Sequence, residues 1–454
     1  MVSDIVIIGG GASGIMAAIA ASKKGALVTL IEKEERLGRK VYITGKGRCN
    51  LTNACDTADY FENVLKNPRF LYSSVYGFCA DDMMKMLEEN GCPVKMERGG
   101  RVFPVSDRSQ DVLSCLERIL NKNKVKILKK TKVSGILRRA LDDDTFKYKA
   151  EGVFLENGEK ISSDAVIVCT GGVSYAATGS DGNFFGQLSG LGHSIIPLHP
   201  GLVPFVIKEE YPARMQGLSL KNVSVSLKCG KKKFKAGPGE MIFTHFGLSG
   251  PLILSLSSDY SRNFGGVSSQ LDTDNSIKKN YYDSLKKDND FGHHESAYVK
   301  GEEAILCIDL KPAVSAGELE ERLYREIDGN KNKSFSNILS PFLPGQLREV
   351  FPDMVNIAGD RKANSITKEE RKKITEYMKA LPFTVCGTRD FNEAIITLGG
   401  INVKEVDPGS MGSKIVKGLF LAGELLDIDA YTGGFNLQAA WSTGYAAGSA
   451  AAQI

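Results

Sequence analysis

Apolar residues near the start of this chain follow two different spacings, which predict a strand, a helix and a second strand. Ile5–Ile8 is a short run of β-branched residues, typical of a buried strand. From about residue 12 to 24, Ile15 and Ile19 lie one helical turn apart among small residues. Val28–Ile31 is a second short apolar run. This order predicts a βαβ unit with parallel strands.

Strand-like and helical spacings continue to about residue 192. Phe78, Met83, Met84 and Leu87 predict one buried face of a mostly helical stretch over residues 60–89. Later apolar runs predict a helix and four strand segments, the helix at about 109–120 and the strands at 94–104, 125–137, 146–154 and 160–168. This mixture is typical of an α/β domain.

The pattern changes near His193, where several prolines interrupt short strand-like runs, so we predict a domain boundary there. A hairpin closing on Gly230 is predicted over residues 218–235. Further strand character follows at 241–250, 304–310 and 384–399. Residues 315–377 have helical spacing, and we expect breaks at Pro341, Pro344 and Pro352.

The last part of the chain returns to the first pattern, with a strand at 418–422 and a helix at 437–450. We therefore predict a discontinuous nucleotide-binding domain, residues 1–192 and 400–454. The inserted domain, 193–399, is expected to be mainly β with a helical subdomain at about 313–382. Asp259–Lys300 is polar with few apolar anchors and is predicted to be a surface excursion.

The first predicted strand meets a glycine motif. Gly9, Gly11 and Gly14 have the spacing G-x-G-x-x-G between a strand and a helix, where a phosphate approaches the backbone and the helix N-terminus. Glu32 ends the second strand, where a carboxylate accepts hydrogen bonds from ribose hydroxyls and repels a 2′-phosphate. The motif predicts FAD or NAD rather than NADP. A βαβ unit with a glycine turn and no ligand is the alternative.

Residues 36–53 combine glycine, asparagine and threonine with Arg39, Lys40, Lys46 and Arg48. This composition predicts a loop rich in hydrogen-bond donors close to the anion. The alternative is a solvated basic loop. The lack of acidic partners, and the two glycines flanking Lys46, favour a ligand-binding role.

Composition narrows the class of protein. Of 454 residues, 42% are hydrophobic and 25% charged, and the net charge of +4 does not by itself indicate a nucleic-acid partner. No apolar run is long enough for a membrane span, and the N-terminus enters the first strand directly, so we expect no signal peptide and a cytoplasmic protein. Nine cysteines without a C-x-x-C pair suit a reducing compartment and predict no metal site.

Five stretches together resemble the YhiN/BaiN family of FAD-dependent oxidoreductases. They are GGGASGIMAA (9–18), GRKVYITGKGRCNLTN (38–53), CTGGVSYAATGSDG (169–182), GEMIFTHFGLSGP (239–251) and LFLAGELLDIDAYTGGFNLQAAWSTG (419–444). The resemblance implies non-covalent FAD in a glutathione-reductase-like fold. In that α/β fold a Rossmann-like domain, a parallel sheet with helices and a β-meander, is interrupted by an inserted β-barrel-like domain.

The glycine motif, the basic loop and the resemblance give one set of expected cofactor-binding residues. Their predicted places run from the pyrophosphate and adenosine to the flavin: Gly9, Gly11, Ala12, Ser13 and Gly14 at the pyrophosphate, with Arg39 and Lys40 adding charge; Glu32, Lys33 and Val133 at the adenosine; Thr44, Gly45, Gly47, Arg48, Cys49 and Asn50 beside the isoalloxazine; Thr170, Gly171 and Gly172 in a second turn; Gly423 and Glu424 at the ribityl chain; and Gly434, Phe435, Asn436 and Leu437 at the start of the last helix.

We hypothesise hydride transfer through FAD to or from a small organic substrate. The resemblance includes reduction of a conjugated C=C bond, with NAD(P)H as a transient donor. Amine oxidation is the alternative within enzymes, and an RNA-binding, tRNA-modifying flavoprotein is an alternative of another class, based on the basic runs 228–235 and 361–373. Arg48 and His245 are substrate-side candidates; buried histidines are more often hydrogen-bonded core residues than catalysts. The sequence leaves the catalytic acid or base, the substrate and the oligomeric state open.

Overall fold

The computed structural model describes residues 3–142, 145–264 and 298–454. The chain forms two compact units, Met1–Leu198 with Ile395–Ile454, and His199–Ala394. The boundaries predicted from the sequence, at 192/193 and 399/400, lie a few residues from these. Each unit is described by itself below.

A parallel sheet forms the centre of the first unit. Its five strands have the order β21-β11-β1-β2-β7, with every neighbour parallel. The strands are β1 (Asp4–Ile8), β2 (Leu27–Ile31), β7 (Lys126–Leu128), β11 (Ala165–Val168) and β21 (Leu419–Leu421). All four residues of β11 are buried. A strand buried on both faces explains its uninterrupted apolar sequence.

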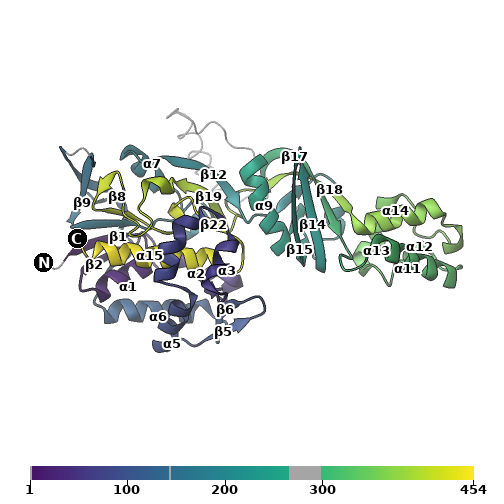
Figure 1. Ribbon diagram of the computed structural model, residues 1–454, viewed down its shortest axis with the longest axis horizontal. Helices are drawn as coiled ribbons and strands as arrows, with labels where there is room; N and C mark the ends of the chain where they lie inside the picture. Colours follow the sequence, from purple (N-terminus) through teal and green to yellow (C-terminus); the bar gives the residue numbers. More distant parts are fainter. Residues whose placement is uncertain (1–2, 143–144, 265–297) are drawn as a thin grey trace. The chain divides into compact units, whose positions relative to one another are not determined.

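Helices α1 (Ala12–Lys23) and α15 (Phe435–Ala451) pack together although they come from opposite ends of the chain (Figure 1). A Cβ atom on Gly444 would lie 2.2 Å from the Ser13 carbonyl oxygen, and one on Gly448 would lie 2.1 Å from that of Ala17. The two helices therefore approach more closely than any residue with a side chain permits at these positions.

The remaining elements of the first unit are short helices and small sheets. A meander of β8 (Val133–Ala140), β9 (Tyr148–Leu155) and β10 (Lys160–Ser162) is joined by β20 (Val416–Lys417). The helices are α2 (Arg39–Ile43), α3 (Thr57–Tyr60), α4 (Tyr72–Gly77), α5 (Ala80–Glu89), α6 (Ser109–Lys122) and α7 (Asn183–Gly190). The other paired strands are β3 (Thr52–Asn53), β6 (Arg101–Pro104) and β5 (Val94–Glu97) in one sheet, β4 (Val64–Lys66) with β22 (Asp429–Ala430), and β12 (Ile195–Gly201) with β19 (Ile396–Ile401).

The second unit is built on a closed antiparallel barrel. Its strand order is β13-β16-β15-β14-β17-β18, the bounds being β13 (Phe205–Ile207), β14 (Ser219–Cys229), β15 (Lys232–Phe243), β16 (Gly247–Ser249), β17 (Tyr298–Asp309) and β18 (Leu381–Arg389). Its helices are α8 (Tyr211–Arg214), α9 (Pro251–Phe264), α11 (Ala316–Gly329), α12 (Phe335–Ile338), α13 (Gly345–Val355) and α14 (Lys368–Lys379). Barrel and helices share one apolar core. The mixed α/β fold and the inserted barrel are confirmed.

Residues 60–89 are mostly helical, as predicted, although β4 separates the short helices. Two other local predictions were wrong. The buried face of α5 contains Met86 together with Met83 and Leu87, while Met84 is only half-buried. This set has the i, i+3, i+4 spacing of one helix face. Pro352 does not break a helix but lies inside α13.

The predicted excursion also began too early. Residues 259–264 continue α9, where Tyr260 is fully buried. Earlier in the same helix, the buried hydroxyls of Ser257 and Ser258 accept the backbone N–H groups of Val203 and Leu202, respectively. A hydroxyl that is hydrogen-bonded in this way can be buried at little cost. The rest of the excursion, to residue 297, lies outside the described residues.

Candidate functional site

The glycine motif forms the turn from β1 to α1. Gly9 has φ +100°, and a Cβ atom there would lie 2.6 Å from the Cys169 carbonyl oxygen. A Cβ on Gly14 would lie 1.9 Å from the Gly9 carbonyl oxygen, whereas one on Gly11 would meet nothing within 4 Å. The outer glycines are thus required by packing, and the middle one borders open space. Helix α1 has no capping side chain and no acidic residue in its first turn, so its N-terminus suits an anion.

Glu32, at the end of β2, is held by backbone donors. The Gly10 N–H donates to Oε2 at 2.7 Å, and the Glu34 N–H donates to Oε1 at 2.8 Å. A carboxylate has about four acceptor positions. Two are therefore occupied in fixing the carboxylate, and capacity remains for the hydroxyl groups of a ribose.

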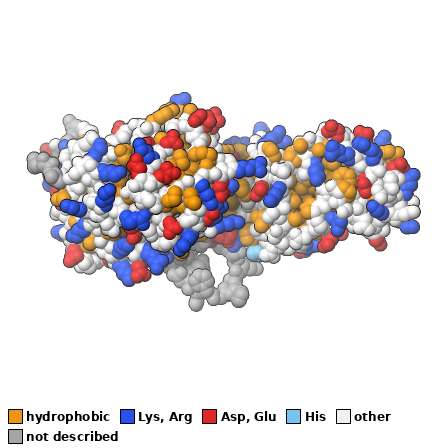
Figure 2. All heavy atoms as spheres, turned by 90° about the horizontal axis from the view of Figure 1, so that it is seen from below, with side chains coloured by type: hydrophobic (Ala, Val, Ile, Leu, Met, Phe, Trp, Pro, Cys, Tyr) orange, Lys and Arg blue, Asp and Glu red, His pale blue; other side chains and the backbone are white. Residues whose placement is uncertain are grey.

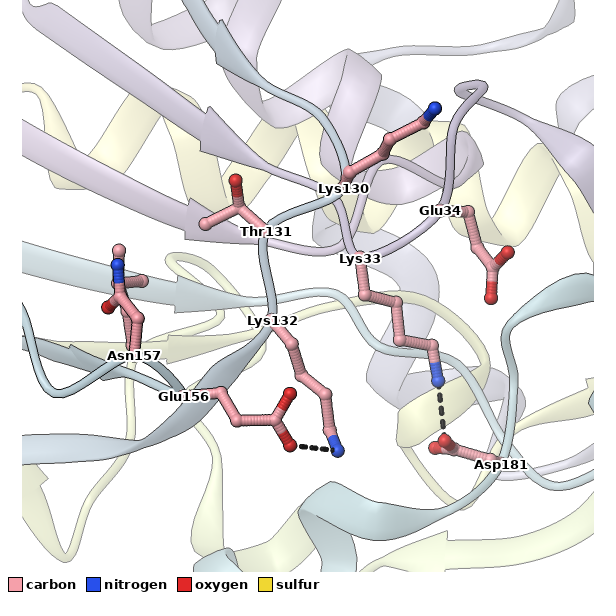
Figure 3. Close-up of a pocket in the computed structure, with 9 residues that line it drawn as sticks. Lys33, Glu34, Lys130, Thr131, Lys132, Glu156, Asn157 and Asp181 are labelled. Carbon is pink, nitrogen blue, oxygen red and sulfur yellow. Dashed lines mark hydrogen bonds and ion pairs between the residues drawn. The ribbon is translucent and has the colours of Figure 1, made fainter.

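A polar pocket of about 720 Å³ lies beyond the end of β2 (Figure 3). It is lined by Lys33, Glu34, Lys130, Thr131, Lys132, Leu155, Glu156, Asn157 and Asp181. Figure 3 shows Lys33 and Asp181 pointing toward each other, and these two side chains form an ion pair. Lys132 pairs with Glu156 at 2.6 Å. Because these lysines are balanced by carboxylates, the pocket suits a neutral polar group better than an additional phosphate. Buried Val133 follows Lys132.

The basic loop of residues 36–53 has acidic partners, contrary to the sequence interpretation. Arg39 pairs with Glu34, and Lys40 lies 3.0 Å from Glu424 Oε2. The stretch is also not simply a loop, since it contains α2 and β3. Most of these partners are far away in the sequence, so local composition gave no sign of them. The face shown in Figure 2 has acidic and basic side chains interspersed in the same way.

Glu424, predicted to bind the ribityl chain, lies in a polar cluster with Lys40, Ser174 and Thr397. Its Oε1 accepts the Thr397 backbone N–H at 2.8 Å and the Ser174 hydroxyl at 2.9 Å. Lys40 Nζ also donates to Ser174 Oγ at 3.1 Å. Lys40 thus contacts the predicted ribityl position as well as lying in the basic loop. Ser174 and Thr397 were not singled out from the sequence, although Thr397 lies two residues before the pair Gly399-Gly400.

Residues 44–50, expected beside the flavin, form a tight turn. Gly45, Lys46 and Gly47 all have positive φ, between 59° and 83°. The Thr44 hydroxyl donates to the Val41 carbonyl at 2.7 Å. Burial raises the pKa of the Cys49 thiol to about 12, which makes this side chain a packing residue. The second predicted turn has the same feature, because burial raises the pKa of Cys169 to about 12.

The start of α15 packs against this turn. When the Asn50 amide is oriented to satisfy both its ends, it accepts the Gly434 N–H at 3.1 Å and donates to the Thr52 carbonyl at 3.2 Å. Helix α15 begins at Phe435, two residues before the predicted start at 437, and has no side-chain cap. Asn436 holds the backbone of Ala430, accepting its N–H at 2.9 Å and donating to its carbonyl at 2.7 Å. Gly423, which follows β21, faces Ser13 in the first turn of α1; a Cβ atom added to Gly423 would lie 2.4 Å from Ser13 Oγ.

The two substrate-side candidates have unexpected surroundings. Arg48 forms ion pairs with Glu97 and Asp107 and lies 4.2 Å over the Phe103 ring. Hydrogen bonds from Arg48 hold the pKa of Glu97 below its usual range, and those from Lys95 and Arg48 do the same for Asp107. Arg48 is therefore not an uncompensated cation. His245 is exposed, in the turn between β15 and β16, so the expectation of a core histidine was wrong.

Two classes of site find no support in the described parts of the chain. No group of three or more His, Cys, Asp or Glu side chains within residues 3–142, 145–264 and 298–454 is placed to hold a metal ion. No helix of the described chain is long and apolar enough to cross a membrane. The polar features of the first unit are two helix N-termini without side-chain caps, the Glu32 carboxylate at the end of β2, and the cluster around Glu424.

Comparisons with known proteins agree with this arrangement. The family described as HI0933-like protein Rossmann domain matches residues 3–450. A "3-dehydro-bile acid delta(4,6)-reductase" of Clostridium scindens is 30% identical over 452 residues, 99% of each chain. A "Ribosomal RNA dihydrouridine synthase" of Haemophilus influenzae is 27% identical over 446 residues, covering 98% of this chain and 97% of the relative.

Among solved structures, a 3-ketosteroid-delta4-(5alpha)-dehydrogenase of Rhodococcus jostii is similar in fold. The TM-score is 0.50 at 15% identity, with all of this chain and 97% of that chain covered. Residues 3–450 match the family, and the first unit contains a glycine turn after β1 with the Glu32 carboxylate beside it. The chain therefore belongs to the HI0933-like family of FAD-dependent Rossmann-fold oxidoreductases.

Proposed function

We propose that this flavoprotein reduces a carbon–carbon double bond conjugated with a carbonyl group in a small organic substrate, with NADH or NADPH as donor. The observation that carries this proposal is the 30% identity, over practically the whole chain, to a relative named as a bile acid delta(4,6)-reductase. Nothing in the residues specifies a steroid. The flavin supplies the hydride chemistry, and the protein binds, orients and tunes it.

We assign non-covalent FAD to the first unit. The glycine turn and the N-terminus of α1 would hold the pyrophosphate, and Glu32 the adenosine ribose. The pocket lined by Lys33 and Lys132 lies next to Glu32 along the chain and supports the assignment of adenine near Val133. Glu424 would accept a ribityl hydroxyl, and residues 44–50 would flank the isoalloxazine. The uncapped N-terminus of α15 would stabilise negative charge on the flavin.

The nicotinamide donor would bind only transiently. The sequence contains one glycine fingerprint, Gly9–Gly14, between a strand and a helix. In the described part of the second unit, all strand pairings of the barrel are antiparallel, and a dinucleotide fold needs parallel strands. The donor would then leave before the oxidant enters the same flavin face.

The test is anaerobic reduction of the purified yellow protein with NADH and with NADPH, followed by mixing with conjugated enones. We expect rapid bleaching by one nicotinamide, reoxidation by an enone, and parallel lines in double-reciprocal plots. Bleaching by a primary amine instead would establish amine oxidation. Intersecting lines, with saturable nicotinamide binding to the oxidised enzyme, would refute the transient donor.

A second candidate is reduction of uracil in RNA. A relative is named as a ribosomal RNA dihydrouridine synthase, and the uracil C5=C6 bond is likewise conjugated with a carbonyl group. The supporting observation is the β14–β15 hairpin, where Lys228 lies directly opposite Lys233, an unfavourable like-charge pairing. Changing both to glutamate should abolish RNA binding at moderate salt and leave reduction of a small enone unchanged. Equal RNA binding by wild type and variant would remove this candidate.

We also propose a cytoplasmic location. All nine cysteines are free thiols in the structure, which suits a reducing compartment.

A further inference from the structure

Thr397, on β19, occupies the centre of the cluster around Glu424. Its side chain is 1% exposed, and its Oγ1 accepts the backbone N–H groups of Val173 at 2.8 Å and Ser174 at 3.1 Å. The same hydroxyl donates to Ser174 Oγ at 3.4 Å. One donor and two acceptor positions are all that a hydroxyl has. The Thr397 side chain is therefore fully used in holding residues 173 and 174.

The contact with the turn after β11 is close. A Cβ atom on Gly172 would lie 2.3 Å from Thr397 Oγ1 and 2.6 Å from Thr397 Cβ. Gly172 is thus glycine because Thr397 fills the space that a side chain would need. A residue on β19 consequently fixes the conformation of a turn that lies more than two hundred residues earlier in the sequence.

The backbone of Thr397 acts on Glu424 at the same time. Its N–H donates to Glu424 Oε1, which also accepts the hydroxyl of the fully buried Ser174. Glu424 Oε1 therefore has both its acceptor positions filled. Glu424 Oε2 has Lys40 as its partner at 3.0 Å among the described residues, and a carboxylate oxygen accepts about two hydrogen bonds. One acceptor position on Oε2 remains for a ligand.

We infer that Thr397 is a positioning residue of the cofactor site, which orients Glu424 and the Gly172–Ser174 turn so that Oε2 is presented to a hydroxyl of the bound FAD. The inference rests on the proposed placement of the ribityl chain at Glu424. It adds a residue from the segment that follows the inserted unit, and Ser174 as its intermediary. Thr397 acts through Glu424 and Ser174, so its effect should be seen in cofactor affinity before any chemistry.

The test measures FAD binding to the apoprotein for Thr397→Val, Thr397→Ser and Ser174→Ala. Valine removes the hydroxyl at nearly constant shape, and serine keeps it. We expect the dissociation constant of FAD to rise about tenfold or more in Thr397→Val, to stay within about threefold in Thr397→Ser, and to rise about tenfold in Ser174→Ala. The visible spectrum of bound FAD should shift in Thr397→Val and be restored in Thr397→Ser. Thr388→Val, at an equally buried threonine of β18, is the matched control and should bind FAD like wild type.

Wild-type FAD affinity in Thr397→Val would overturn the inference. Equal losses in Thr397→Val and Thr397→Ser would also overturn it, because the loss would then follow from any change of this side chain and not from removal of the hydroxyl. If Thr397→Val does not fold, unchanged affinity in Ser174→Ala overturns the inference. No substrate is present in these titrations. A wild-type protein that binds FAD but reduces no enone would refute the proposed function and leave this inference standing.

Discussion

The packing of α1 against α15 makes a quantitative prediction for Gly444→Ala. The new Cβ would lie 2.2 Å from the Ser13 carbonyl oxygen and 2.9 Å from two further backbone atoms of Ser13. Carbon–oxygen contacts normally lie at roughly 3.3–3.6 Å, so the helices must separate by about 1 Å. Backbone atoms cannot rotate away, which places the cost near the upper end of the about 1–3 kcal/mol range for overpacking. Alanine returns up to about 1 kcal/mol through its helix propensity.

We therefore expect Gly444→Ala to destabilise the first unit by about 2 kcal/mol, or about 4–8 °C in Tm for a domain of this size. The chain has one tryptophan, Trp441, which is fully buried in α15 and donates to the Leu51 carbonyl at 3.0 Å. Its fluorescence during urea unfolding of the apoprotein reports on this unit. FAD affinity should fall as well, because Ser13 lies in the first turn of α1.

Gly186→Ala is the matched control in the same unit. Gly186 lies inside α7, and an added Cβ would meet nothing within 4 Å. This variant should gain about 0.5–1 kcal/mol. If Gly444→Ala is as stable as wild type, or if both variants lose the same stability, the close approach of the helices is not what the glycine serves.

Three further predictions concern charge and protonation. Glu32→Gln should weaken FAD binding roughly ten- to a hundredfold and Glu32→Arg more strongly, since hydrogen bonds to a charged group contribute about 1.5–3 kcal/mol. Equilibrium dialysis measures these affinities. Unchanged FAD content in the arginine variant would remove the ribose assignment. Burial lowers the pKa of His193 below its usual 6.5, so its contribution to stability is present above pH 6.5 and is lost as the pH falls through the folded-state pKa. In urea unfolding between pH 8 and 5, the free energy of unfolding should therefore fall with decreasing pH by up to about 1.4 kcal/mol per pH unit. His193→Gln should reduce this pH dependence. Cys49 and Cys169, with pKa values of about 12, should resist iodoacetamide in the native protein at pH 8, and their labelling in a peptide mass map would contradict their burial.

Local sequence patterns made the βαβ unit of β1, α1 and β2 predictable. Ile5–Ile8, the glycine motif and Glu32 lie within one βαβ unit, so their spacing fixes their relation. The hairpin around Gly230 was predictable for the same reason, because β14 and β15 pair across a short turn. Partners that are distant in sequence were not predictable. Lys40 and Glu424 are 384 residues apart, and Ser174 and Glu424 are 250 apart, yet they form one cluster.

The charge balance of residues 36–53 wrongly indicated basic side chains without acidic partners, for a related reason. The basic residues of 36–53 looked unpartnered because most of their carboxylates, such as those of Glu97 and Glu424, arrive from other elements. Polarity also failed as a guide at residues 259–264, which continue α9 and bury Tyr260. Both failures arise because a sequence shows the type of a polar group but not the partner that it finds.

The interrupted parallel sheet imposes an order on biosynthesis. Strand β11 ends at residue 168, and its neighbour β21 begins at residue 419, so 251 residues must be translated before the two can pair. At about 5–20 residues per second this interval lasts roughly 13–50 s. All strands of the barrel lie between residues 205 and 389 and emerge within that time. Meanwhile β11 presents a bare apolar edge, which is a template for wrong pairing. Protection of this edge by chaperones should therefore matter most until β21 has been translated.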